Sequence, residues 1–143
     1  MSNLDIFRMR FKGSLFVPGD PGHARAIDRW AINAVKPTAI VAVVRDTRDI
    51  ILALGFASAN SLRVSVRGGG YAEPDTPPSV VGLIIDLSRH FINVRVDPDT
   101  MTCHIQGGAT WRGIDIVTTP YGLACVGPSV NGVSTLYPSS SLY

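Results

Sequence analysis

The order of apolar and polar residues predicts three strands in the first two thirds of the chain. Residues 39–44 and 80–88 are almost uninterrupted apolar runs, a pattern typical of parallel strands buried on both faces. Residues 61–67 alternate instead, and we expect Leu62, Val64 and Val66 to face the core. A parallel sheet is therefore the predicted centre of the fold.

Helical spacing occurs between and beside these strands. Residues 46–60 have apolar side chains on one side and Asp46 as the expected N-cap. The residues expected to be buried in this helix are Ile50, Ile51, Leu54 and Ala57. We expect an earlier helix over residues 19–35, capped by Asp20, and a short later one that begins after Thr110. Strand, helix and strand in this order form a right-handed crossover, so residue 67 ends its strand at the carboxyl edge of the sheet.

Residues 92–106 predict a hairpin whose strands flank the turn at residues 97–100. Within its second strand, Cys103 alternates with Met101 and Ile105, which places all three in a core. After Val133 the chain becomes rich in serine and loses its periodicity. We therefore divide it into an N-terminal segment with a helix (1–36), a central domain (37–133) and an irregular tail (134–143).

Charge and composition exclude several classes of protein. The 143 residues have a net charge of +2, and the arginines are scattered without a basic run, so nucleic acid is not an expected partner. No stretch of 18 apolar residues predicts a membrane span, and no signal peptide is visible, which makes the cytoplasm the default location. The two cysteines have no ligand spacing around them, so no metal site is expected.

A run of three glycines, Gly68–Gly70, follows Arg67 at the end of the alternating strand. Glycine reaches positive φ without steric cost, so such a loop can turn consecutive N–H groups toward an anion. An ordinary surface turn explains the glycines equally well. The motif is neither GxGxxG nor a Walker loop. Asp86, in an apolar strand, needs partners, and we expect it to hold the neighbouring loop through backbone hydrogen bonds.

The order of several short motifs resembles a known family. They are a proline before "IV", "RD" at the start of a helix, then "VRGGG", "IDLS", "GGATW" and "YGLA". Over residues 37–133 the chain is similar to the FAD-binding domain of the p-cresol methylhydroxylase and vanillyl-alcohol oxidase type, most nearly its berberine-bridge-enzyme-like branch. The resemblance implies an α+β fold in two layers, with the first βαβ subdomain present and the second one begun.

The resemblance also implies a set of cofactor-binding residues. The loop from Arg67 to Gly70 would wrap the pyrophosphate of FAD, with Arg67 either adding positive charge or ending the strand in solvent. Tyr71 would stack on the cofactor or donate a hydrogen bond to it, or would simply be a half-buried aromatic residue of the loop. The segment 127–133 resembles a later part of the family's site. Its candidate residues are Gly127, Val130 and Val133.

The chain departs from the family pattern in two ways. Many members attach FAD covalently through a histidine after the glycines, where this chain has Tyr71, so we expect non-covalent FAD. Cys125 does not match the second attachment motif and is expected to be a small buried residue. The rest of the flavin domain and the substrate domain have no counterpart, so we expect a fragment and assign no catalytic base.

Three functions are compatible with these features. The first is an FAD-linked oxidoreductase that transfers a hydride from a small organic substrate to FAD. The second is a non-catalytic remnant that binds a nucleotide or a partner. The third is a reductase of the same fold, such as the enolpyruvyl reductases of cell-wall synthesis. The sequence sets no oligomeric state.

Overall fold

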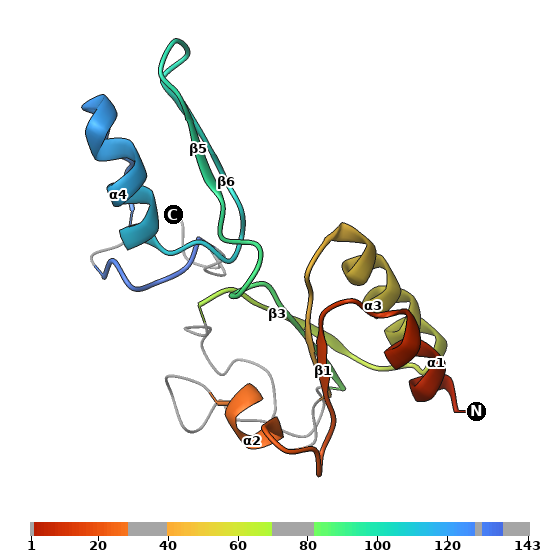
Figure 1. The fold of residues 1–143 in the computed structure, drawn as a ribbon. Helices are drawn as coiled ribbons and strands as arrows, with labels where there is room; N and C mark the ends of the chain where they lie inside the picture. The colour runs from red at the N-terminus through yellow and green to blue at the C-terminus, as the bar shows by residue number, and fades with distance from the viewer. Residues whose placement is uncertain (1, 29–39, 70–81, 128–129, 136–143) are drawn as a thin grey trace.

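The computed structural model describes residues 2–28, 40–69, 82–127 and 130–135, and Figure 1 shows the arrangement of their elements. The elements are α1 (Asn3–Arg10), β1 (Ser14–Phe16), α2 (His23–Ala26), β2 (Ile40–Val43), α3 (Thr47–Ala59), β3 (Val64–Arg67), β4 (Leu83–Asp86), β5 (Val94–Asp97), β6 (Thr102–Ile105), α4 (Trp111–Thr118) and the 3₁₀ helix η3 (Thr119–Tyr121). The mixed α+β class expected from the sequence is confirmed. None of the helices in these ranges is long and apolar enough to cross a membrane.

Four strands form the main sheet in the order β1-β2-β4-β3. Strands β2, β4 and β3 are parallel, as their apolar patterns predict, and β1 pairs with β2 in the antiparallel direction. In the register of the parallel strands, Val43 lies opposite Asp86, and Asp86 lies opposite Arg67. These three residues end their strands, so they mark the carboxyl edge of the sheet.

Helices cover the two faces of this sheet unequally. On one face, α3 packs on β4 and α1 packs on α3, where Phe7 stacks on Phe56 with ring centroids 4.5 Å apart. Helix α1 was not predicted, although its N-terminus has a capping box in which Ser2 and Asp5 bond each other's backbone. On the other face, Ile27 and Phe16 pack on the buried residues of β2 and β4. The sheet is thereby buried on both sides at its centre.

The rotation of α3 differs from the expected one. Ile51 and Leu54 are 65% and 47% exposed, whereas Asp49, Ala53 and Ala57 are buried. The small alanines let the helix approach the sheet closely, and this turns the bulkier residues outward. The expected burial of Ile51 and Leu54 is therefore wrong, while Ala57 is buried as expected.

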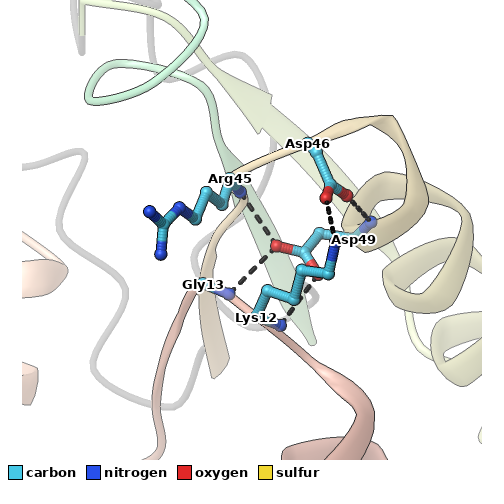
Figure 2. A network of polar contacts seen from close by, with 5 residues as sticks. All are labelled: Lys12, Gly13, Arg45, Asp46 and Asp49. Atoms are coloured by element: carbon cyan, nitrogen blue, oxygen red, sulfur yellow. Dashed lines mark hydrogen bonds and ion pairs between the residues drawn. The ribbon is translucent and has the colours of Figure 1, made fainter.

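Asp49 fixes the start of α3 through three backbone hydrogen bonds (Figure 2). Its carboxylate is fully buried and accepts from the amides of Lys12 at 2.9 Å, Gly13 at 3.0 Å and Arg45 at 2.9 Å. Asp46 is the N-cap, as expected, since its side chain accepts from the Asp49 amide at 3.1 Å. A single carboxylate thus joins the chain before β1, the end of β2 and the first turn of α3.

The valines of β3 are more exposed than expected. Val64 and Val66 are 38% and 49% exposed, whereas Ser65 and Arg67 are partly buried. Because β3 is the edge strand, its valines lie on the face of α3 but beyond the part of the sheet that α3 covers. Alternation in the sequence shows which residues share a face of a strand, but it does not show whether another element buries that face.

Asp20 does not cap α2, contrary to expectation. The N-cap is Gly22, at φ 88°, and it makes no side-chain cap bond. The Asp20 carboxylate instead accepts from the Val17 amide at 3.1 Å and from Arg8 at 2.7 Å. The end of the expected helix, residues 29–35, lies outside the described residues.

The hairpin and α4 lie together on one side of the molecule, away from α1 and α3 (Figure 1). The expected hairpin is confirmed, with Val94 opposite Ile105 and Asp97 opposite Thr102. Thr110 caps α4 as expected, accepting from the Gly113 amide at 3.3 Å. Met101, however, sits in the turn at φ 51° and is 75% exposed, so its expected place in a core is wrong.

Candidate functional site

The glycine loop lies where the hairpin side of the molecule meets the sheet. Gly68 is buried, and a Cβ on it would fall 2.4 Å from Ser134 Oγ and 2.7 Å from the carbonyl oxygen of Gly107. A Cβ on Gly69 would lie 3.1 Å from both the Cβ and the amide nitrogen of Ser134. Gly68 is therefore required for the close approach of a distant segment, and a side chain at Gly69 would be a tight fit. Gly70 and Tyr71 lie outside the described residues.

The same glycines present free hydrogen-bond donors. Neither the Gly68 amide nor the Gly69 amide donates a hydrogen bond within the described residues. A buried N–H group without an acceptor costs about 1–3 kcal/mol, so such groups are uncommon in folded proteins. The loop thus combines a side closed by Ser134 with donors that are available to a ligand.

A cavity of about 430 Å³ opens beside these amides, at the carboxyl edge of the sheet. It is lined by Phe16, Arg25, Ala26, Asp28, Val43, Arg67, Gly68, Gly69, Asp86, Ser88 and Arg89. The lining residues come from β1, the ends of the three parallel strands, the segment of α2 and the turn after β4. Ligands of open α/β sheets bind outside the carboxyl ends of the strands, and this cavity has that position.

Arg67 and Asp86 form a buried ion pair at the floor of the cavity. Their side chains are 10% and 3% exposed. Arg67 also donates to the carbonyl oxygen of Asp28 at 3.2 Å, and Asp86 accepts from the Ser88 amide at 2.9 Å. The backbone bond expected of Asp86 is confirmed, while a solvated end for Arg67 is wrong. The positive charge of Arg67 is neutralised by its partner.

Two other arginines in the cavity have no such partner. Arg25 and Arg89 are exposed, and neither forms an ion pair in the described parts of the chain. They come from different elements, Arg25 from α2 and Arg89 from the turn after β4. Neither arginine was predicted to belong to a site, because an isolated arginine at these positions has no local sequence signature.

The later candidate residues lie at the start of α4. A Cβ on Gly127 would fall 2.5 Å from the ring of Trp111, and Val130 is 53% exposed. Val133 is buried, and its carbonyl oxygen accepts from the Trp111 amide at 3.0 Å. Val133 is next in sequence to Ser134, which packs against Gly68 and Gly69 of the glycine loop.

Ser134 and Thr135 are held firmly although the sequence suggested an irregular tail from residue 134. Ser134 is 2% exposed and forms an isolated bridge with Thr110. The Thr135 amide donates to Ala109 at 3.0 Å. Only their long-range partners distinguish these residues from the serines that follow, so composition did not reveal them.

Cys103 and Cys125 are both free and half-buried. Burial raises the pKa of the Cys103 thiol, and the neighbouring Cys125 raises it further. The two thiols are therefore close to each other, although 22 positions apart in sequence. Within the described residues, no group of three His, Cys, Asp or Glu side chains could hold a metal ion.

Comparison with known proteins identifies the class to which this architecture belongs. The family model described as "FAD binding domain" matches residues 37–136. The FAD-linked oxidoreductase hasG of Aspergillus fumigatus is 31% identical over 132 residues, which are 92% of this chain and 28% of that protein. The family resemblance of the motifs is thereby confirmed, and the chain belongs to the FAD binding domain family.

Solved structures show the same fold. The crystal structure of 6-hydroxy-D-nicotine oxidase from Arthrobacter nicotinovorans has a TM-score of 0.77 at 22% identity and covers 87% of this chain. That of carbohydrate oxidase from Microdochium nivale has a TM-score of 0.76 at 20% identity and covers 94%. The chain spans 27% and 29% of these two structures, so it corresponds to less than a third of each.

Proposed function

We propose that this chain binds FAD non-covalently and serves an FAD-linked oxidoreductase that acts on a small organic molecule. The observation that carries the proposal is the pair of available amides at Gly68 and Gly69, beside a cavity at the carboxyl edge of the sheet. The family match to residues 37–136 supports FAD as the ligand. We further propose residues 37–133 as the cofactor-binding domain.

The residues present fit the pyrophosphate group of FAD. A diphosphate needs several fixed N–H donors, and the Gly68 and Gly69 amides are held in place by the contact with Ser134. Ser88 also lines the cavity, as do Arg25 and Arg89, which form no ion pair in the described part of the chain. When bound, FAD accepts a hydride from an organic substrate. The chain's own part is to bind and orient the cofactor, and none of its described residues is assigned as a catalytic base.

Relatives support a small-molecule substrate. One is named as an oxidase of 6-hydroxynicotine, (R)-6-hydroxynicotine oxidase of Paenarthrobacter nicotinovorans, and another as a carbohydrate oxidase. These chemically different substrates leave the substrate of this chain open. The shared element is the flavin, so binding of FAD is the property to test first.

Titration of FAD with the 143-residue chain tests the proposal, with quenching of flavin fluorescence as the signal. We expect saturable binding that ADP reverses and riboflavin does not, because we assign the Gly68 and Gly69 amides to the diphosphate and not to the flavin ring. Absence of saturable binding would overturn the proposed function. Equal competition by riboflavin would overturn the assignment of Gly68 and Gly69.

Non-covalent attachment has its own test. Tyr71 occupies the position at which many family members have the histidine that bonds flavin. Acid precipitation of the holoprotein should therefore leave the flavin in the supernatant. Flavin that remains with the precipitated protein would contradict this part of the proposal.

A further inference from the structure

We propose that Arg25 and Arg89 form a diphosphate clamp across the cavity and supply the positive charge that the glycine amides lack. This inference rests on the proposed function, because it assigns residues to the phosphate groups of the same cofactor. It concerns the ADP half of FAD and requires no contact with the flavin ring.

The charge of Arg67 is already balanced within the protein. Arg67 is next to the glycines, but its guanidinium is buried in the ion pair with Asp86. A diphosphate bridge carries negative charge, and amides alone stabilise such charge less well than amides combined with guanidinium groups. The cations available for it in the described part of the lining are Arg25 and Arg89.

The ion pair has a second consequence, because it positions both of the elements that carry these arginines. On one side, Arg67 donates to the carbonyl oxygen of Asp28, which closely follows α2. On the other side, Asp86 accepts from the Ser88 amide, the residue before Arg89. Arg67 is therefore a positioning residue that joins the two walls of the cavity.

The turn that carries Arg89 is fixed by further backbone bonds. The Leu87 amide donates to the carbonyl oxygen of Arg67 at 2.8 Å, and the Phe91 amide donates to that of Leu87 at 3.1 Å. The phenylalanine carbonyl accepts in turn from Gly108 at 2.8 Å. The backbone of Arg89 is thus held on both sides while its side chain remains exposed. A fixed backbone with a free guanidinium suits the bidentate binding of phosphate.

The experiment measures binding of ADP and of inorganic pyrophosphate to the 143-residue chain by calorimetry. Arg25→Gln and Arg89→Gln are compared with Arg63→Gln, an exposed arginine just before β3 and so at the opposite edge of the sheet. We expect each cavity variant to weaken both ligands by about tenfold. Arg63→Gln should bind both ligands as tightly as the unchanged chain does. Adenosine, which lacks phosphate, should bind the unchanged chain and all three variants with the same affinity.

Salt provides a second readout. Binding of pyrophosphate to the unchanged chain should weaken as the salt concentration rises. A double variant that combines Arg25→Gln with Arg89→Gln should lose most of this dependence on salt. All three side chains are exposed, so the variants should have the unfolding curve of the unchanged chain.

The outcomes separate the clamp from the proposed function. If the unchanged chain binds FAD and ADP but the cavity variants bind equally well, the clamp is refuted and the proposed function stands. If Arg63→Gln weakens binding as much, general surface charge is responsible and the clamp is also refuted. If the unchanged chain binds neither FAD nor ADP, the proposed function fails, and the clamp fails with it.

Discussion

Replacement of Gly68 by alanine should destabilise the protein through one steric contact. The added Cβ would lie 2.4 Å from Ser134 Oγ, 2.7 Å from the Gly107 carbonyl oxygen and 2.9 Å from Ser134 Cβ. The hydroxyl can rotate away, but the carbonyl oxygen and the Cβ are fixed to the backbone. Ordinary carbon contacts are about 3.5–4.0 Å, so the segments must separate by more than half an ångström.

The magnitude follows from known costs of overpacking. Extra atoms in a well-packed site cost about 1–3 kcal/mol. The backbone of Gly68 is not at positive φ, so alanine adds no conformational strain, and it gains about 0.4–1 kcal/mol from a less flexible unfolded chain. We expect a net loss of about 1–2 kcal/mol, or roughly 3–8 °C in Tm for a chain of this size.

Gly55 offers a matched control with the opposite sign. It lies inside α3, and a Cβ there would meet nothing within 4 Å. Gly55→Ala should therefore stabilise the protein by about 0.8–1 kcal/mol, the difference in helix propensity. Thermal unfolding followed by circular dichroism compares the two variants. A Gly68→Ala protein as stable as the unchanged chain would refute the steric reasoning.

Three more substitutions or modifications test other parts of the structure. Asp49→Asn should lower the free energy of unfolding by about 3 kcal/mol, measured with urea, because the amide replaces one accepting oxygen with a donor; a loss below about 1 kcal/mol would contradict this. Asp86→Asn should lower the free energy of unfolding by about 3–5 kcal/mol, because it leaves Arg67 buried without its counter-charge. The double variant Asp86→Leu with Arg67→Met has no buried charge and should recover much of this loss. Equal losses in the two proteins would refute the reasoning. Burial is the largest cause of the raised pKa of Cys103 and remains when Cys125 is replaced, so iodoacetamide should react slowly with Cys103 at pH 8 in the Cys125→Ser variant; labelling as fast as that of free cysteine would contradict this.

Local patterns predicted the elements that depend on nearby residues. The parallel strands, α3, the hairpin and the caps at Asp46 and Thr110 all follow from periodicity and short-range hydrogen bonding. Which face each element buries was predicted less well. Val64 and Val66 look like core residues in the sequence, but they lie on an edge strand beyond the cover of α3. Whether a strand face is buried depends on which other elements pack on it, and a short stretch of sequence does not show this.

Residues with distant partners were the hardest to predict. Asp49 accepts from the amides of Lys12 and Gly13, which are more than 30 positions away, and no local pattern predicts these bonds. Ser134 resembles the other serines of its segment and yet is buried against the glycine loop. A polar residue such as Asp49 or Ser134 acquires these contacts only when the fold brings distant backbone groups next to it. The local sequence around the residue does not show which groups these will be.

Gly68 shows how one residue can meet two physical requirements at once. A glycine that binds phosphate must leave its amide accessible, whereas a glycine that permits close packing must leave its Cβ direction empty. At Gly68 the Cβ direction is filled by Ser134 and Gly107, and the amide beside the cavity has no acceptor among the described residues. The two requirements act on different atoms of the residue, so they do not compete. A substitution at Gly68 should accordingly disturb packing first, and any loss of cofactor binding should follow from displacement of the loop and not from a blocked amide.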